Sequence, residues 1–288
     1  MISGSTKVFC VIGDPIEHSL SPIMHNAAFK HLGLNAVYVA FNVKRENLEG
    51  AVKGVRSLGI AGVNVTMPHK TAIISHLDEV DQEARFVEAV NTVLNIEGRL
   101  VGFNTDGVGA LRALKENGLD PKGKKILLLG AGGAGKAIAF QLAREAEELR
   151  ILNRNGYKAK QLADKLEKTF HKKILGEHLS QTTLNEWIKD ADVLINATSI
   201  GMHPKDNQTP VDRGLLRPEL TVMDIVYNPL ETKLLREAKS LGAKVVYGVE
   251  MLIFQGAASF EIWWKRPAPV DVMREAVMNK LVRERAEA

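Results

Sequence analysis

The segment that most constrains the fold is residues 124–135, an apolar run that ends in a turn with four glycines. Its residues 126–129 are bulky and uninterrupted, as in a strand buried on both faces of a parallel sheet, and residues 136–146 are typical of an alanine-rich helix. Glycines at such a turn let the backbone approach a pyrophosphate, which the free N–H groups and the dipole of the helix N-terminus attract. The spacing therefore predicts a dinucleotide site. The turn residues that would line it are Gly130, Ala131, Gly132, Gly133, Ala134 and Gly135.

The same turn also approaches the pattern of a P-loop, because Gly130 is followed at the right distance by Gly135 and Lys136. A P-loop needs Ser or Thr after the lysine to ligate Mg²⁺, and this chain has Ala137 there. We therefore favour the dinucleotide interpretation over a kinase or triphosphatase.

The next predicted strand, residues 149–152, ends at Asn153 and Arg154 without the acidic residue that binds the ribose of NAD. A guanidinium can instead pair with the 2′-phosphate of NADP, and Lys158 would add charge. The strand end thus predicts NADP as the cofactor. The alternative is that Arg154 is a solvated charge at a strand end.

The composition of the chain limits which other kinds of protein it could be. The 288 residues, 45% hydrophobic and 25% charged, suit a globular protein of about two domains. The net charge of +4 is scattered, without a basic arm, so nucleic acid is not an expected partner. The lone Cys10 excludes an internal disulfide and fits a reducing compartment, and its apolar surroundings predict a packing role. We find no run that would cross a membrane, no signal peptide and no metal-ligand spacing among the eight histidines, and expect a cytoplasmic protein without metal.

Two alternations of strands and helices meet near residue 106, which predicts an α/β protein with three segments. Residues 1–106 would form a mixed α/β domain, with strands at 7–12, 36–42 and 62–65, helices at 22–32, 46–58 and 70–77, and a hairpin at 90–104. Residues 107–247 would form a Rossmann-like, doubly wound parallel sheet, after a helix at 107–117 and with strands near 126, 149, 193, 222 and 245. Residues 248–288 would form two helices, 251–265 and 270–285, that pack back on the first domain.

Clusters of polar residues at strand ends make the chain resemble the shikimate dehydrogenase family over nearly its full length. That family reduces 3-dehydroshikimate to shikimate with NADPH, a step towards aromatic amino acids. The motifs that carry the resemblance are HSLSP (18–22), NVTMPHK (64–70), AVNT (89–92), NTDG (104–107), GAGGAG (130–135), NR (153–154), NATSIGM (196–202), DIVYNP (224–229) and GVEMLIFQGAASFEIW (248–263).

The resemblance implies a catalytic pair. Lys70 would stabilise the charge that grows on the ketone oxygen and deliver the proton in reduction, and Asp106 would align the lysine with the reacting hydroxyl. The alternative is structural, with Lys70 starting a helix and Asp106 capping the next one. The substrate carboxylate would meet Ser19, Ser21 and Tyr227. The ring hydroxyls would be bound by Thr66, Asn91, Asp106 and Gln255.

The resemblance also implies further cofactor residues in the second domain. They are Asn153, Arg154, Lys158, Thr198, Ser199, Met202, Val226, Gly248 and Met251. Thr198 and Ser199 are alternatively turn formers, and Met251 a core residue.

Two departures from the family pattern stand out. Asn155 and Lys158 replace a threonine and a second arginine, which would relax the preference for NADP, and Lys265 replaces a glycine. The sequence leaves open an NAD-dependent quinate/shikimate dehydrogenase, a noncatalytic sensor of cofactor or shikimate, and a monomer or a homodimer.

Overall fold

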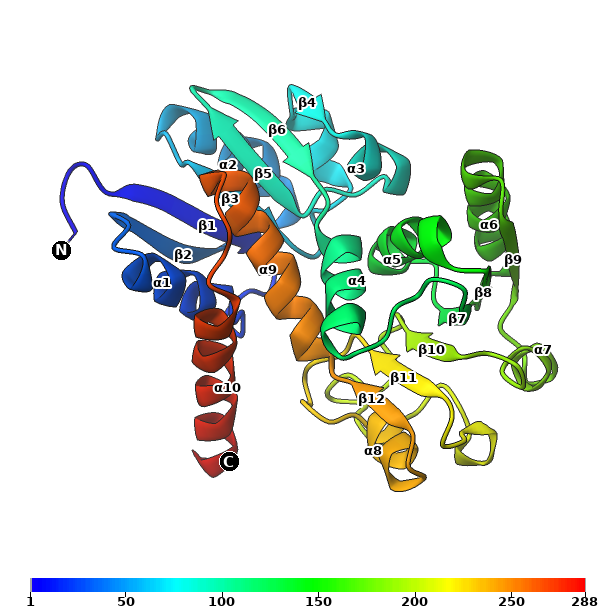
Figure 1. Cartoon of the computed structure of the whole chain (residues 1–288). Coiled ribbons are helices and arrows are strands. Elements are labelled where there is room, and N and C mark those ends of the chain that lie inside the picture. Colours follow the sequence, from blue (N-terminus) through cyan, green and yellow to red (C-terminus); the bar gives the residue numbers. More distant parts are fainter. Residues whose placement is uncertain (1, 288) are drawn as a thin grey trace. The chain divides into compact units, whose positions relative to one another are not determined.

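A computed structural model describes residues 2–287 of the chain, with side chains as far as Arg283. The chain forms two compact units (Figure 1). The first combines the residues up to Thr105 with those from Ile253 onward, and the second spans Asp106–Leu252.

The first unit contains a mixed sheet. Its strands are β1 (Lys7–Gly13), β2 (Ala36–Asn42), β3 (Gly62–Val65), β4 (Glu79–Val80), β5 (Thr92–Ile96) and β6 (Arg99–Phe103). Their order is β2-β1-β3-β5-β6-β4, with β1 parallel to β2 and β3, β4 parallel to β6, and β5 antiparallel to β3 and β6. Its helical elements are α1 (Ser21–His31), η1 (Arg45–Asn47), α2 (Leu48–Ser57), η2 (Ala72–His76), α3 (Gln82–Val87), α9 (Gly248–Trp264) from Ile253 onward, and α10 (Val270–Glu287).

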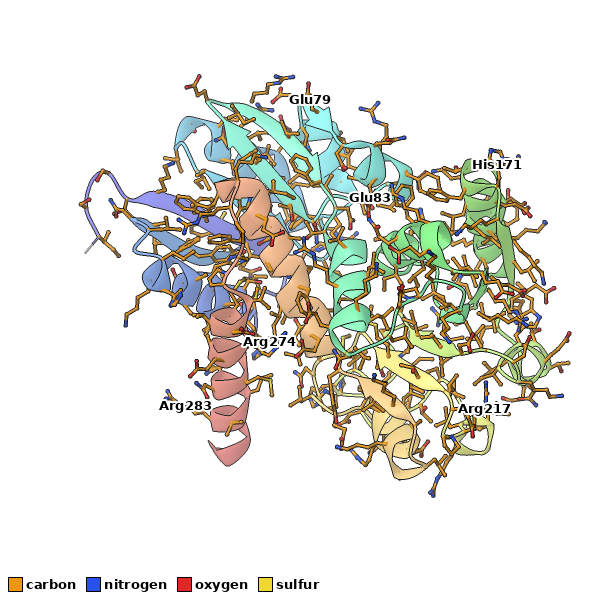
Figure 2. The ribbon with its side chains drawn as sticks, viewed as in Figure 1. Glu79, Glu83, His171, Arg217, Arg274 and Arg283 are labelled. Atoms are coloured by element: carbon orange, nitrogen blue, oxygen red, sulfur yellow. The ribbon has the colours of Figure 1, made fainter. Side chains whose placement is uncertain are left out.

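Both faces of this sheet are covered, because side chains alternate along each strand. Cys10 belongs to a core that includes Val52 of α2. On the opposite face the Phe9 ring packs at a tilted angle, with its centroid 5.3 Å from that of Phe29 in α1 and 5.1 Å from that of Trp263 in α9. Helix α10 packs on α1, and its Arg274, labelled in Figure 2, lies 5.5 Å from the ring centroid of Phe254 in α9.

The second unit is built on a parallel sheet. Its strands are β7 (Lys125–Leu129), β8 (Glu148–Asn153), β9 (Lys173–His178), β10 (Val193–Asn196), β11 (Thr221–Asp224) and β12 (Lys244–Val246). All pairs in the order β12-β11-β10-β7-β8-β9 are parallel, and the order reverses between β7 and β10. Its helical elements are α4 (Asp106–Glu116), α5 (Gly133–Glu145), α6 (Gly156–Phe170), α7 (Gln181–Trp187), η3 (Arg213–Leu215) and α8 (Lys233–Ser240).

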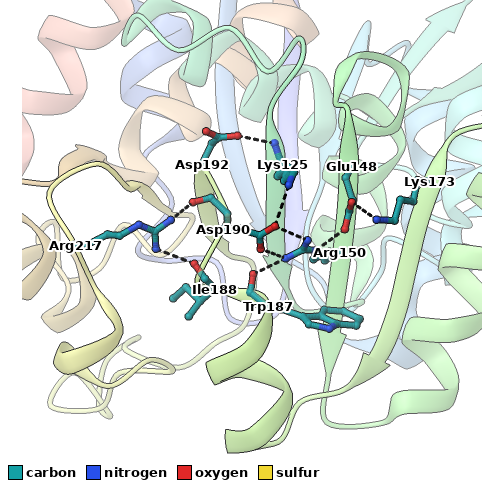
Figure 3. A network of polar contacts seen from close by, with 10 residues as sticks. Lys125, Glu148, Arg150, Lys173, Trp187, Ile188, Asp190, Asp192 and Arg217 are labelled. Carbon is teal, nitrogen blue, oxygen red and sulfur yellow. Dashed lines mark hydrogen bonds and ion pairs between the residues drawn. The ribbon is translucent and has the colours of Figure 1, made fainter.

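An ion-pair network lies where the parallel strands begin, opposite the carboxyl ends (Figure 3). The Arg150 side chain is buried and donates to Glu148 Oε1 at 2.5 Å, Asp190 Oδ1 at 2.5 Å and the Trp187 carbonyl at 2.8 Å. Lys173 donates to Glu148 Oε2 at 2.5 Å, so the buried carboxylate has two cationic partners. These contacts tie β8, β9 and the loop before β10 together and leave the opposite edge to the loops that could hold a ligand.

The predicted fold class is confirmed: a mixed-sheet unit is followed by a doubly wound parallel sheet of Rossmann type. The helix predicted at residues 70–77 is wrong. Only the 3-10 turn η2 forms there, because the chain must extend again at Leu77 and enter β4 at Glu79. The sequence analysis also missed β4, α3 and β9, which are short or polar.

Candidate functional site

The predicted glycine turn joins β7 to α5 and fits close backbone packing. Gly130 has φ +109°, and a methyl group there would lie 2.8 Å from the carbonyl oxygen of Ala197. A methyl on Gly135 would lie 2.2 Å from the carbonyl oxygen of Gly130. Gly132 instead faces open space, is exposed and precedes α5 without a side-chain cap. The first turn of α5 holds no acidic residue, so its N–H groups suit an anion.

The end of β8 lies directly beside this turn. The N–H of Ala131 donates to Asn153 Oδ1 at 3.2 Å, which places the next residue, Arg154, near the turn. Arg154 and Lys158 are exposed, and among the described residues no carboxylate pairs with either side chain. Asn155 caps α6, because its Oδ1 accepts from the N–H of Lys158 at 3.2 Å. Its side chain therefore acts in the helix cap.

A buried carboxylate joins the loops after β10 and β11. Asp224 accepts from Asn196 Nδ2 at 3.0 Å and from the Val226 N–H at 3.1 Å with Oδ1, and from Thr232 Oγ1 at 2.7 Å with Oδ2. Asn196 in turn accepts from the N–H and the hydroxyl of Thr198, at 3.1 and 2.7 Å. Burial raises the pKa of Asp224 to about 6, against the lowering effect of these hydrogen bonds. The sequence analysis gave Asp224 no role.

The remaining candidates of the second unit differ in exposure. Ser199 is exposed, and 40% of the surface of Met202 is exposed, whereas Met251 is buried. A methyl on Gly248 would lie 2.5 Å from the carbonyl oxygen of Val226, so α9 begins against the loop after β11. Burial raises the pKa of the Tyr227 phenol.

In the first unit, Ser19 and Ser21 stand at the start of α1. The Ser21 N–H donates to Ser19 Oγ at 3.3 Å, and Ser21 itself is buried. Pro22 follows as the first-turn proline that helix starts favour. The two hydroxyls are therefore held next to each other at one helix end.

Thr66 and Lys70 lie in the loop that leaves β3. The Thr66 N–H donates to the Ile12 carbonyl at 3.0 Å, and the Lys70 carbonyl accepts from the Val90 N–H at 2.8 Å. The Lys70 side chain is half-buried. The ring of the neighbouring His69 is buried, and its Nε2 lies 2.6 Å from the Val43 carbonyl oxygen.

Asn91 and Gln255 come together within the first unit, although 164 positions separate them in the chain. Asn91 Nδ2 lies 3.4 Å from Gln255 Oε1. Asn91 is buried and its Oδ1 accepts from the Thr105 N–H at 2.8 Å. Asn64, Thr92, Thr105 and Ser259 surround it as buried polar residues that we had not assigned to the site. For Thr92 and Thr105 the sequence signal was the asparagine directly before each of them, Asn91 and Asn104.

Asp106 is buried and is the first residue of α4, in the second unit. A carboxylate at this end of a helix is favoured by the helix dipole. A methyl on Gly107 would lie 2.3 Å from the Ala137 carbonyl oxygen, so α4 and α5 approach closely behind Asp106.

Within the part of the chain that the structure describes, no group of three or more His, Cys, Asp or Glu side chains could hold a metal ion. Nor does any helix of residues 2–287 have the length and apolarity needed to span a bilayer.

Three family models match the chain in sequence order. They are described as the shikimate dehydrogenase substrate binding domain at residues 11–93, shikimate / quinate 5-dehydrogenase at residues 112–227, and the shikimate 5'-dehydrogenase C-terminal domain at residues 248–278.

Full-length relatives agree with these models. The shikimate dehydrogenase (NADP(+)) of Methanopyrus kandleri is 49% identical over 283 residues, covering 97% of this chain and 98% of the relative. A crystal structure of shikimate dehydrogenase in complex with NADP+ is 45% identical, with a TM-score of 0.91 and 98% of both chains covered. A shikimate 5-dehydrogenase from Listeria monocytogenes, in complex with shikimate and NAD, is 42% identical, with a TM-score of 0.89 and 95% of this chain and 97% of that chain covered.

Proposed function

The chain belongs to the shikimate dehydrogenase (NADP+) family, and from this premise we propose that it catalyses the reversible, NADP-dependent interconversion of 3-dehydroshikimate and shikimate. The observation that carries the cofactor assignment is the hydrogen bond from the Ala131 N–H to Asn153 Oδ1. It holds an uncapped helix N-terminus beside Arg154, whose guanidinium pairs with no acid among the described residues. A pyrophosphate and a 2′-phosphate are the anions that such an arrangement suits.

The first unit would bind the substrate and the second the cofactor. When bound, NADP(H) supplies or accepts the hydride. Lys70 would stabilise the negative charge on the reacting oxygen and transfer its proton, and Asp106 would orient the lysine and that hydroxyl. Ser19, Ser21 and Tyr227 would bind the substrate carboxylate. Thr66, Asn91 and Gln255, together with the catalytic pair, would bind the ring hydroxyls.

The other cofactor contacts follow from the second unit. Residues 130–135 would approach the pyrophosphate, and Asn153, Arg154 and Lys158 the adenosine side. Thr198 and Ser199 would border the adenosine and ribose, with Met202 nearby. Gly248 and Met251 would lie beside the nicotinamide, and Val226 would also contact the cofactor. Met251 is buried, as a methionine of the core would also be.

The second candidate is an NAD-dependent quinate/shikimate dehydrogenase. It is favoured by the family model that names both substrates and by the NAD bound to the Listeria relative. The exposed Arg154 favours NADP instead. A noncatalytic sensor would retain ligand binding without turnover. We further propose a cytoplasmic monomer or homodimer, which light scattering and cell fractionation would test.

The decisive experiment measures initial rates of oxidation of shikimate and of quinate, each with NADP⁺ and with NAD⁺. Preference for shikimate with NADP⁺ is the expected result. Equal or higher rates with quinate or NAD⁺ would establish the second candidate, and no turnover with bound shikimate would establish the sensor. Replacing Lys70 by Ala should abolish turnover while calorimetry still detects shikimate, which separates its chemical role from a structural one.

A further inference from the structure

Ser259 is the centre of a buried hydroxyl cluster in the first unit. It lies on α9, one turn after Gln255, and is fully buried. Its hydroxyl donates to the backbone carbonyl of Gln255 at 3.0 Å and accepts from Asn64 Nδ2 at 3.0 Å. Its oxygen also lies 2.8 Å from Thr92 Oγ1 and 3.3 Å from Thr105 Oγ1. One side chain therefore links a helix to three segments of the sheet and its loops.

The contacts of Asn64 fix its amide in one orientation. Its Nδ2 donates to the Asn91 carbonyl at 3.1 Å, an oxygen that can only accept. Its Oδ1 consequently accepts from the Tyr38 hydroxyl at 2.7 Å. With its own proton on the Gln255 carbonyl, Ser259 is left as an acceptor for Asn64 and for Thr92.

Asn91 is oriented in the same way. The Thr105 N–H can only donate, so the atom it contacts at 2.8 Å must be Asn91 Oδ1. The Thr105 hydroxyl, 3.1 Å from that oxygen, can donate to it as well and lies 3.0 Å from Nδ2, while the single proton of the Thr92 hydroxyl goes to Ser259. Asn91 Nδ2 is thereby turned toward Gln255 Oε1, 3.4 Å away.

We propose that Ser259 is a positioning residue for the substrate: its hydroxyl fixes, through Thr92, Thr105 and the α9 backbone, which amide atoms Asn91 and Gln255 present. This rests on the proposed function, in which both amides bind ring hydroxyls. An amide turned over exchanges a donor for an acceptor, and a polyol is recognised by matching donors and acceptors. Thr105 also immediately precedes Asp106 in the chain, so the cluster anchors the residue before one member of the catalytic pair.

The test is Ser259→Ala, assayed for KM and kcat with each substrate varied separately. Loss of one buried hydrogen-bonding group corresponds to about a tenfold change in an equilibrium constant. We expect KM for shikimate to rise about tenfold, while KM for NADP⁺ stays within about twofold of the wild type. Direct calorimetry of shikimate binding should show the same loss.

Two further variants separate positioning from stability. Ala257→Gly removes a buried methyl from the same helix and costs about 1 kcal/mol of helix stability, but it removes no hydrogen bond, so KM for shikimate should not change. Thr92→Val should raise KM as Ser259→Ala does. The double variant should have a shikimate KM no higher than about that of the single variant with the larger rise, because both hydroxyls belong to one cluster.

An unchanged shikimate KM in a folded Ser259→Ala enzyme would overturn the inference, as would equal rises in both KM values. Should Ser259→Ala not fold, Thr92→Val is the second test, and an unchanged shikimate KM in that variant would overturn the proposal equally. Failure of the proposed function is distinguishable, because the wild type itself would then not oxidise shikimate with either nucleotide.

Discussion

Asp224 and Asn196 share a hydrogen bond of 3.0 Å in which both side chains are fully buried, at the carboxyl ends of the adjacent strands β11 and β10. Because a carboxylate only accepts, Asn196 must present its Nδ2 to Asp224 and its Oδ1 to Thr198. The pair thus fixes the start of the loop after β10, which carries the proposed cofactor residue Thr198. The hydrogen bond from the Val226 N–H to the same carboxylate does this for the next loop.

The first prediction concerns the pH dependence that Asp224 imposes on stability. Burial raises its pKa from 3.8 to about 6. Its stabilising contribution is therefore full below pH 3.8 and is lost as pH rises through about 6, a change of about 3 kcal/mol in the free energy of unfolding. Asp224→Asn should gain stability relative to wild type between pH 4 and 7 in urea titrations. The exposed Asp206→Asn is the control, and parallel pH profiles for wild type and Asp224→Asn would contradict the assignment.

The second prediction uses two glycines of the same turn. Gly135→Ala places a methyl 2.2 Å from the Gly130 carbonyl oxygen and should cost about 2 kcal/mol of stability. Gly132→Ala meets nothing within 4 Å and has φ −79°, so its melting temperature should match the wild type. Its KM for NADP⁺ should nevertheless rise, because the methyl would occupy the surface at which we propose that the pyrophosphate binds. Wild-type cofactor kinetics in Gly132→Ala would argue against a pyrophosphate at this turn.

The third prediction concerns the choice of nucleotide. Arg154→Gln removes the exposed guanidinium and should raise KM for NADP⁺ by about 10- to 100-fold with little change for NAD⁺, since a charge-assisted hydrogen bond contributes about 1.5–3 kcal/mol. Lys158→Gln should have a smaller effect because an ammonium lacks the planar fork. Steady-state kinetics with both nucleotides checks this. Equal losses with NADP⁺ and NAD⁺ would mean that Arg154 does not contact the 2′-phosphate.

The fourth prediction follows from Lys265, the residue just after α9. It has φ +50°, the left-handed conformation in which helices usually end with glycine. Lys265→Gly should therefore stabilise the protein by about 1 kcal/mol. Arg266→Gly, at the next position, should bring no such gain. Thermal unfolding of both variants tests this, and a lower melting temperature for Lys265→Gly would show that the left-handed backbone at this position does not destabilise the protein.

The fifth prediction concerns the network of Figure 3. Burial raises the pKa of Glu148, but the hydrogen bonds from Lys173 and Arg150 outweigh it and lower the pKa overall; those from Arg150 and Lys125 lower the pKa of Asp190. This stability is present above the unfolded pKa values near 4 and is lost as pH falls below them. Arg150→Met should cost about 3 kcal/mol at pH 7, and its stability should fall less steeply in acid.

The control for that variant is Lys53→Met, which removes an exposed ion pair with Glu49 and should leave the free energy of unfolding nearly unchanged. If Arg150→Met lost no more stability than Lys53→Met at pH 7, the network would not stabilise the second unit.

The sequence alone determined the features that depend on the pattern of neighbouring residues. The buried run before the glycine turn, the hairpin around Gly98 and the doubly wound sheet follow from periodicity and turn chemistry, which act over a few residues. The absence of an acid after β8 is likewise visible in the sequence. The resemblance named the candidate site residues, but the periodicity of the chain could not have selected them.

Tertiary structure decided which polar groups are buried together. Asn64 and Ser259 are 195 positions apart, so no local pattern predicts that they share a hydrogen bond. The helix expected at residues 70–77 gave way to a 3-10 turn because the sheet required a strand at Glu79. The backbone of Lys265 adopts a left-handed conformation only because α9 ends directly before it. In each case the free energy of burying and pairing distant groups exceeded the local conformational preference, and that balance is set only when the chain is folded.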